Sequence, residues 1–109
     1  MSRMGELTRA RDEARRIEAT ALARAALASL RDANIDAWVI GSLARGEFRQ
    51  HSDIDVLIDA PPDRKSEALV TCLRALREFP SSIVFKSDVP PHILPYMIAE
   101  ACDESGLCG

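Results

Sequence analysis

The sequence predicts an α/β (α+β) fold in which a small, mixed, largely antiparallel sheet of three to four strands is covered by helices. Three observations lead to this prediction. A helix-forming segment without proline opens the chain over residues 6–31. Short apolar runs bounded by glycine or proline then alternate with helical patterns. The connection between the first two runs is too short for a crossover helix, so these strands are expected to be antiparallel.

Residues 6–31 are rich in Ala, Leu, Arg and Glu, and this composition predicts one long helix. Its apolar residues recur every three or four positions and predict a buried stripe. Because alanines dominate the stripe, another element must approach it closely, either the sheet of this chain or a partner surface. Asp32, Ala33 and Asn34 are expected to stop the helix. The predicted stripe consists of Leu7, Ala10, Ala14, Ile17, Ala21, Ala25 and Ala28, and Leu22, Leu27 and Leu30 are expected to widen it toward its end.

The remaining elements follow from apolar patterning and from the turn residues between them. Ser42 is expected to cap the short helix after the first strand. Pro80 ends the next helix, and Pro95 fits the first turn of the last one. Asp59, beside two prolines, is expected in a turn. Strands are expected at 35–40, 54–58 and 82–87, and helices at 42–48, 66–79 and 95–103.

The helix expected at 66–79 has an apolar face that should meet the sheet. Cys72 lies in this pattern and is expected to be a small core residue. With Cys102 and Cys108 it makes an odd number of cysteines without a Cys-x-x-Cys pair, which supports neither a disulfide framework nor a zinc site. The residues expected on the face are Leu69, Leu73, Leu76 and Phe79.

Length and composition exclude several classes of protein. A chain of 109 residues has room for one domain, expected to span 1–109. Its net charge of −3 argues against direct binding to the nucleic-acid backbone. The sequence has no apolar run of about 20 residues and does not begin with a signal-peptide pattern. A cytoplasmic location without membrane contact is therefore expected.

Two aspartates at a spacing of two lie on the second apolar run. Strand side chains alternate between faces, so Asp53 and Asp55 are expected on one face and Ile54, Val56 and Ile58 on the other. Two carboxylates held that close repel each other. A hard cation such as Mg²⁺ would remove the conflict, because it binds carboxylate oxygens and keeps sites for water and phosphate.

A glycine-containing turn precedes the aspartates. Gly41 allows the backbone to approach a ligand closely, and Ser42 offers a hydroxyl and backbone amides to a phosphate. Gly46 fits the same turn or a simple helix end. Arg45 could neutralise phosphate charge or pair with a carboxylate, and the sequence favours neither. The exposed loop before the aspartates includes His51.

The joint pattern closely resembles the signature of the minimal nucleotidyltransferases, a family of the DNA polymerase β superfamily. Six residues separate Gly46 from Asp53, as in that signature, and the order of elements from about residue 20 to residue 102 resembles the polymerase β-like fold. The residues that carry the resemblance are Gly41, Ser42, Arg45, Gly46, Ser52, Asp53 and Asp55.

The resemblance implies a metal-dependent transfer of a nucleoside monophosphate from ATP. Asp53 and Asp55 would hold Mg²⁺ and act as catalytic residues. Gly41 and Ser42 would bind the β- and γ-phosphates, with Arg45, Gly46 and Ser52 as further nucleotide-binding residues.

The chain departs from the family pattern at one position. The family usually has a third carboxylate on the following strand, and the corresponding position falls near Ser82. Asp88 is the nearest acid and is a candidate third catalytic residue, although its place before Val89 and two prolines fits a turn or cap better. Without a substitute the domain would bind a nucleotide with one metal and turn it over poorly or not at all.

Family members this short resemble the antitoxins of two-component systems whose toxin is a HEPN-type ribonuclease. The resemblance implies that the chain binds such a toxin and transfers AMP to a tyrosine hydroxyl of it. Two alternatives stay open. One is a degenerate domain that neutralises its partner by contact alone, and the other is a small-molecule (antibiotic) adenylyltransferase. The alanine-striped helix could also serve a homo-oligomer.

Overall fold

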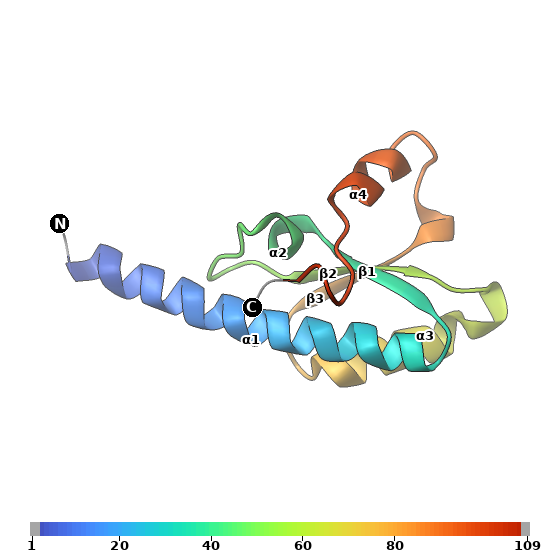
Figure 1. Cartoon of the computed structure of the whole chain (residues 1–109), viewed down its shortest axis with the longest axis horizontal. Helices are drawn as coiled ribbons and strands as arrows, with labels where there is room; N and C mark the ends of the chain where they lie inside the picture. Colours follow the sequence, from blue (N-terminus) through green and yellow to red (C-terminus); the bar gives the residue numbers. More distant parts are fainter. Residues whose placement is uncertain (1–2, 108–109) are drawn as a thin grey trace.

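The structure is a computed structural model that describes residues 3–107 (Figure 1). Cys108 lies outside these residues. None of the helices between residues 3 and 107 has the length and apolar character needed to cross a bilayer. The elements are α1 (Arg3–Asp32), β1 (Asp36–Ile40), α2 (Gly41–Arg45), β2 (Ile54–Asp59), the 3₁₀ turn η1 (Pro62–Arg64), α3 (Lys65–Leu76), β3 (Ser81–Phe85), the 3₁₀ turn η2 (Lys86–Asp88) and α4 (Leu94–Glu100).

The sheet has the order β1-β2-β3 within the described residues. β1 and β2 are antiparallel and β2 and β3 are parallel, because α3 makes the crossover between the last two strands. The outer edge of β1 is bridged at one point, where Val39 and Cys102 exchange two backbone hydrogen bonds of 2.8 Å. The predicted mixed sheet and the antiparallel first pair are confirmed.

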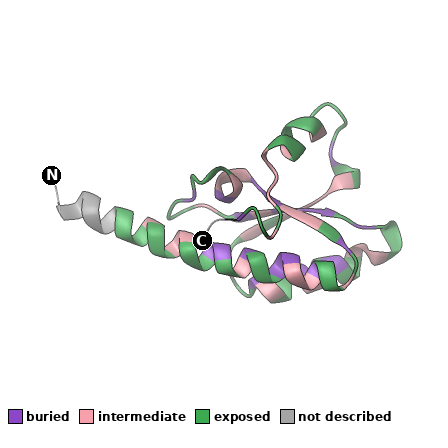
Figure 2. Cartoon of the chain, viewed as in Figure 1, coloured by how far each residue is buried: buried purple, intermediate pink, exposed green. Residues whose placement is uncertain are grey.

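Helices α1 and α3 lie side by side across one face of the sheet (Figure 1). Between them and the strands is the main core, and Figure 2 draws all buried residues of the molecule in purple. Ile54, Val56 and Ile58 of β2 are completely buried there, as their alternation predicts. From α1, Leu30 contributes a completely buried side chain, and from α3 Leu76 does the same.

The predicted stripe on α1 is wrong, although Leu27 and Leu30, which were expected to widen it, are buried. The buried residues of this helix are Ala19, Thr20, Ala23, Ala26, Leu27 and Leu30. Of the stripe expected from sequence, Ala10, Ala14, Ala21 and Ala25 are exposed, Ile17 is 51% exposed and Ala28 is half-buried, while Leu7 lies outside the residues whose burial is described. Alanine occurs on every side of this helix, so several stripes have the same periodicity. Contact with α3 and the sheet selects the face.

The predicted face of α3 is half wrong. Leu76 and Phe79 are buried, but Leu69 is 36% exposed and Leu73 is 42% exposed. The buried residues of α3 are Ala68, Cys72 and Leu76, and the helix makes its most extensive contact with α1. Two of the three side chains are small, which suits the packing of one helix against another. Cys72 is a core residue as predicted, and burial raises the pKa of its thiol to about 11.

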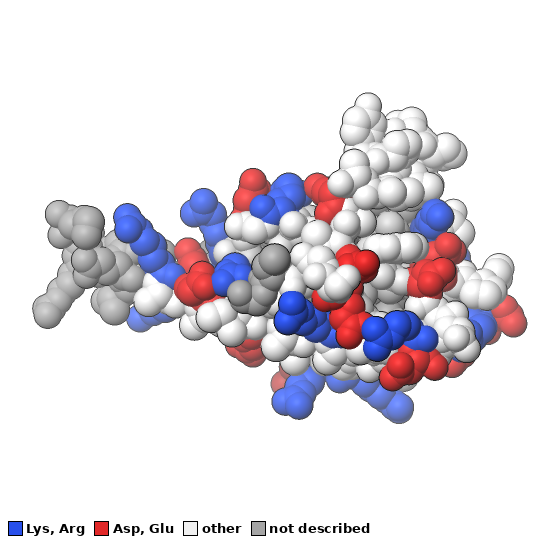
Figure 3. All heavy atoms as spheres, in the orientation of Figure 1, with Lys and Arg blue, Asp and Glu red and all other residues white. Residues whose placement is uncertain are grey.

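The opposite face of the sheet is covered only in part. A small cluster of Ile40, Leu57 and Val89 packs there against Trp38, Val84 and the α4 side chains Leu94 and Met97. Residues 89–99 contain no Lys, Arg, Asp or Glu, and the protrusion that holds most of α4 is white in Figure 3. Ile93, Tyr96 and Ile98 are exposed on it. This half of the molecule is therefore thinly packed.

The predictions for the ends of helices and strands are confirmed in part. Ser42 is not the cap of α2, because the helix begins one residue earlier and Ile40 occupies the cap position. Asp59 is not a turn residue but the last residue of β2, where it pairs with Lys86 at 3.7 Å. Asn34 stops α1 as expected, in a left-handed conformation with φ of 61°. Pro95 lies in the first turn of α4, also as expected.

Candidate active site

Asp53 and Asp55 lie at the beginning of β2. Asp53 directly precedes the strand and is exposed, and Asp55 is its second residue and is half-buried. Because Ile54 and Val56 point into the main core, the Asp55 carboxylate between them faces the other side of the sheet, near Glu100 at the end of α4. Asp53 lies close enough for its charge to act on Asp55. The strand thus holds two acids without losing its buried face.

Gly41 brings the turn after β1 against Asp55. Ile40 and Asp55 are partners in the antiparallel register, so the turn begins beside the carboxylate. Gly41 has a φ of +74°, and a Cβ placed on it would lie 2.3 Å from Oδ2 of Asp55. Only glycine therefore allows both this backbone conformation and this approach.

The carboxylate of Asp55 is in an unfavourable electrostatic environment. Burial raises its pKa, and the neighbouring charge of Asp53 raises it further. The Arg45 guanidinium opposes this effect, while Glu100 adds a third negative charge. A cation bound between the carboxylates would offset the repulsion from Asp53 and stabilise the charged form of Asp55.

Glu100, the last residue of α4, joins the site although no pattern in the sequence points to it. Its Oε1 accepts a hydrogen bond from the Gly41 backbone N–H at 3.2 Å, and its Oε2 lies 3.1 Å from Nη1 of Arg45. Arg45 also lies 3.2 Å from a carboxylate oxygen of Glu47. Of the two roles left open for Arg45, carboxylate pairing is the one present here.

The other residues of the predicted nucleotide-binding turn have identifiable places. Ser42 is half-buried in the second position of α2, and its carbonyl accepts the Glu47 N–H at 2.8 Å. Gly46 ends α2 in a left-handed conformation with φ of +75°. Ser52 accepts the Arg49 N–H on its hydroxyl at 2.9 Å and so shapes the loop before Asp53.

Arg15 of α1 anchors the same loop. Its Nη2 donates to the Ser52 carbonyl at 3.2 Å, immediately before Asp53. Its guanidinium lies 4.4 Å from the ring centroid of Phe79 and 5.9 Å from that of Phe48. This cation–π and hydrogen-bond contact links the start of β2 to α1. In the sequence, Arg15 is one arginine among several in a charged helical segment, and nothing marks it as a site residue.

Asp88 is not brought to this site. It follows β3 in η2, and because β2 and β3 are parallel, this position is near the end of β2 and not near its beginning. Lys65 lies 3.6 Å from the Asp88 carboxylate. The strand register places Ser82 beside Asp55, as expected from the family resemblance. Among residues 3–107, no three His, Cys, Asp or Glu side chains form a potential metal-binding group.

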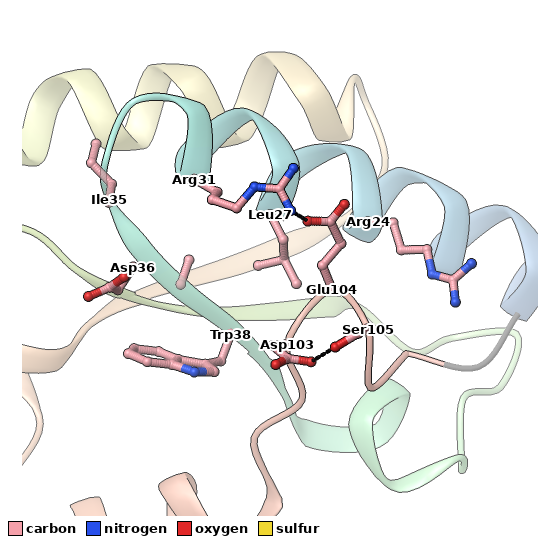
Figure 4. A pocket seen from close by; sticks show the side chains of 10 residues that line it. Arg24, Leu27, Arg31, Ile35, Asp36, Trp38, Asp103, Glu104 and Ser105 are labelled. Atoms are coloured by element: carbon pink, nitrogen blue, oxygen red, sulfur yellow. Dashed lines mark hydrogen bonds and ion pairs between the residues drawn. The ribbon is translucent and has the colours of Figure 1, made fainter.

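A cavity of about 620 Å³ lies away from the aspartates, along the outer edge of β1 (Figure 4). It is bounded by α1, the first half of β1 and residues 103–105. Several of its polar side chains are already engaged: Arg31 pairs with Glu104, Ser105 bonds to Asp103, and Arg24 donates to the Leu107 carbonyl. None of these contacts involves Asp53 or Asp55, so the cavity is separate from the aspartate pair.

The comparison with known protein families decides the assignment. The family described as Nucleotidyltransferase domain matches residues 22–105. The chain belongs to this nucleotidyltransferase family. No curated protein and no solved structure matches it significantly.

The family generally uses a nucleoside triphosphate and a divalent metal ion, and the match to this nucleotidyltransferase domain implies a nucleotide substrate. The donor set fits a hard divalent cation in two respects. Asp53 and Asp55 offer carboxylate oxygens at the beginning of β2, and Asp55 is held where its own charge is disfavoured. Since no third acid, His or Cys of residues 3–107 completes a metal-binding group with them, water and phosphate oxygens would complete the coordination.

Proposed function

We propose that this nucleotidyltransferase domain is a minimal nucleotidyltransferase that transfers AMP from ATP, with Mg²⁺, to a hydroxyl group of a partner protein. The observation that carries the proposal is the approach of Gly41 to Asp55. It sets a left-handed glycine and its backbone amide directly beside a carboxylate pair. A triphosphate and a cation need such a combination, whereas a folded domain gains no stability from it.

Each residue of the site has a defined task in this reaction. Asp53 and Asp55 would hold Mg²⁺, which supplies charge neutralisation at the phosphates when bound. Gly41, Ser42 and Arg45 would bind the β- and γ-phosphates, while Gly46 and Ser52 fix the ends of the turn and loop. The acceptor oxygen bonds to the α-phosphorus, the bond to the β-phosphate oxygen breaks, pyrophosphate leaves and the hydroxyl proton passes to solvent.

A protein acceptor is favoured by the surface next to the site. The protrusion of residues 89–99 ends at Glu100 and exposes Ile93, Tyr96 and Ile98. Exposed apolar groups of this kind suit a protein surface better than a polar small molecule. We propose that the partner is the HEPN-type ribonuclease toxin of a toxin–antitoxin pair and that the acceptor is a tyrosine of it.

The test is an incubation of the chain with Mg²⁺, α-labelled ATP and the protein encoded by the neighbouring gene, followed by intact mass measurement. The expected result is an increase of one or more AMP units on the partner. Asp55→Asn should lower the rate of AMP transfer by on the order of a hundredfold or more, because one of the two carboxylates proposed to hold Mg²⁺ is lost. Asp59→Asn is the matched control on the same strand, and its rate should equal that of the parent.

A second function, neutralisation of the partner by contact alone, is favoured by Ser82. The register puts this hydroxyl where the family resemblance calls for the third carboxylate. If the partner forms a stable complex and loses its activity without gaining AMP, and if Asp53→Asn and Asp55→Asn do not weaken the complex, contact is sufficient and the transfer proposal fails.

A further inference from the structure

Glu100 occupies the two donors that the proposed reaction assigns to phosphate. One of its carboxylate oxygens takes the Gly41 N–H at 3.2 Å, and the other takes Arg45 at 3.1 Å. Asp55 adjoins the same glycine, since a Cβ added to Gly41 would lie 2.3 Å from its Oδ2. With Asp53, three negative charges therefore gather at this turn, and the Arg45 guanidinium offsets them only in part.

Two explanations of Glu100 can be compared. As a third metal ligand it would have to lie with Asp53 and Asp55 in one group, and no such group of three exists among residues 3–107. As an occupant of phosphate donors it would have to accept from an amide and a cation of the turn, and it does both. The contacts favour the second explanation.

We propose that Glu100 acts as an internal anion that holds the triphosphate donors of the site and leaves them when a nucleotide binds. This inference rests on the proposed function, because it takes Gly41 and Arg45 to be the groups that receive phosphate. A phosphate oxygen and a carboxylate oxygen compete for the same N–H and the same guanidinium, so the affinity for nucleotide is reduced by the strength of the Glu100 contacts.

The fluorescence of Trp38 can report the displacement of Glu100. Glu100 is the last residue of α4, and this helix packs through Leu94 and Met97 on the small cluster that also contacts Trp38. Trp38 is the single tryptophan of the chain. Release of Glu100 frees the end of α4 and should alter the surroundings of Trp38.

The experiment measures binding of ATP with Mg²⁺, and separately of inorganic tripolyphosphate, by calorimetry. The proteins are the parent, Glu100→Gln and Glu47→Gln. Glu47 is the other carboxylate partner of Arg45, whereas the Gly41 N–H donates to Glu100, so Glu47 is the matched control. Glu100→Gln should bind both ligands roughly threefold to tenfold more tightly, since a neutral amide is a weaker competitor than a carboxylate. Glu47→Gln should stay within about twofold of the parent.

Tighter binding is the informative sign, because a purely structural role of Glu100 predicts weaker binding and a lower melting temperature. Glu100→Ala, which removes the acceptor atoms as well, should show the same direction as Glu100→Gln. In the parent, ligand addition should change Trp38 fluorescence, and in both variants the change should be smaller. If Glu47→Gln gains as much ligand affinity as Glu100→Gln, the effect comes from Arg45 alone. The claim that Glu100 competes with phosphate for the Gly41 N–H would then be wrong.

Failure of this inference differs from failure of the proposed function. Unchanged or weaker affinity of Glu100→Gln, beside clear ATP binding by the parent, overturns only the role of Glu100. If the parent and all variants bind neither ATP nor tripolyphosphate, the turn holds no phosphate and both proposals are wrong. If only the Glu100 variants bind, the internal anion closes the site in the parent, which supports the inference.

Discussion

The two faces of the sheet differ in how completely they are covered. On one face, α1 and α3 bury Ile54, Val56 and Ile58 completely. On the other face, α4 covers Leu57 but leaves Asp55 half-buried at the end of the cluster. Because strand side chains alternate, a single strand serves both faces with residues that are neighbours in sequence.

One face of the sheet stabilises the fold, and the other carries the candidate active site. The covered face supplies apolar burial, which is the main favourable contribution to folding. The open face holds like charges, a glycine in a left-handed conformation and exposed apolar side chains on α4, and these features contribute little to stability. Substitutions on the two faces should therefore affect different measurements.

The largest expected effect on stability is on the covered face. Leu30→Ala removes a completely buried side chain from α1 and should lower the free energy of unfolding by about 2–5 kcal/mol. Ile98→Ala, at a 50% exposed position of α4, should change it by less than about 0.5 kcal/mol. Urea unfolding of both variants measures the difference. Equal losses would mean that α4 is as tightly packed as α1.

A pair of glycine substitutions tests the contact between the turn after β1 and Asp55 on the open face. Gly41 and Gly46 have nearly the same φ, +74° and +75°, but a Cβ on Gly41 meets Asp55 whereas one on Gly46 meets nothing within 4 Å. Gly46→Ala should cost only the left-handed backbone conformation, about 1 kcal/mol. Gly41→Ala should cost about 2–3 kcal/mol, because the side chain must also displace the carboxylate.

Thermal unfolding and ATP binding distinguish the two glycine variants. Gly41→Ala is expected to weaken ATP binding more than Gly46→Ala does, since it moves Asp55 and the turn together. If both variants lose the same stability and have the same affinity for ATP, the contact between Gly41 and Asp55 contributes to neither.

The sequence was a good guide where a local pattern decides the structure. The alternation in β2 predicted which side chains are buried, and the short connection from Gly41 to Asp53 predicted the antiparallel pair. Gly41 was expected to let the backbone approach a ligand, which stays a prediction; the close approach present in the structure is to Asp55 of the same chain. These features depend on residues close in sequence.

Features that depend on tertiary contact were missed. The stripe on α1 was misplaced because alanines surround the helix and only the docking of α3 selects a face. Glu100 reaches Gly41 across 59 positions, and Arg15 reaches Ser52 across 37. Neither pairing leaves a periodic or motif signal. Asp88 was considered for its proximity in sequence, but the parallel register carries it to the other end of β2.

The smallest expected effect concerns Asp55 itself and has an unusual sign. Because burial and Asp53 raise its pKa in the folded state, the native protein binds a proton more readily there than the unfolded chain does. Its contribution to stability is therefore most favourable below the unfolded pKa and is lost as pH rises through the folded value. Asp55→Asn should be slightly more stable than the parent at pH 7, by less than about 1 kcal/mol because solvent screens a half-buried group.

Urea unfolding of Asp55→Asn and the parent at pH 7 and pH 4 measures this effect. The gain at pH 7 should shrink toward pH 4, where more of the parent carries a proton on Asp55. Asp59→Asn is again the control, since it removes a carboxylate that Lys86 partners at 3.7 Å and should give no gain. A variant that loses transfer while gaining stability would show that Asp55 is retained for chemistry at a cost to the fold. A loss of stability at pH 7 would instead make Asp55 a structural residue of the open face.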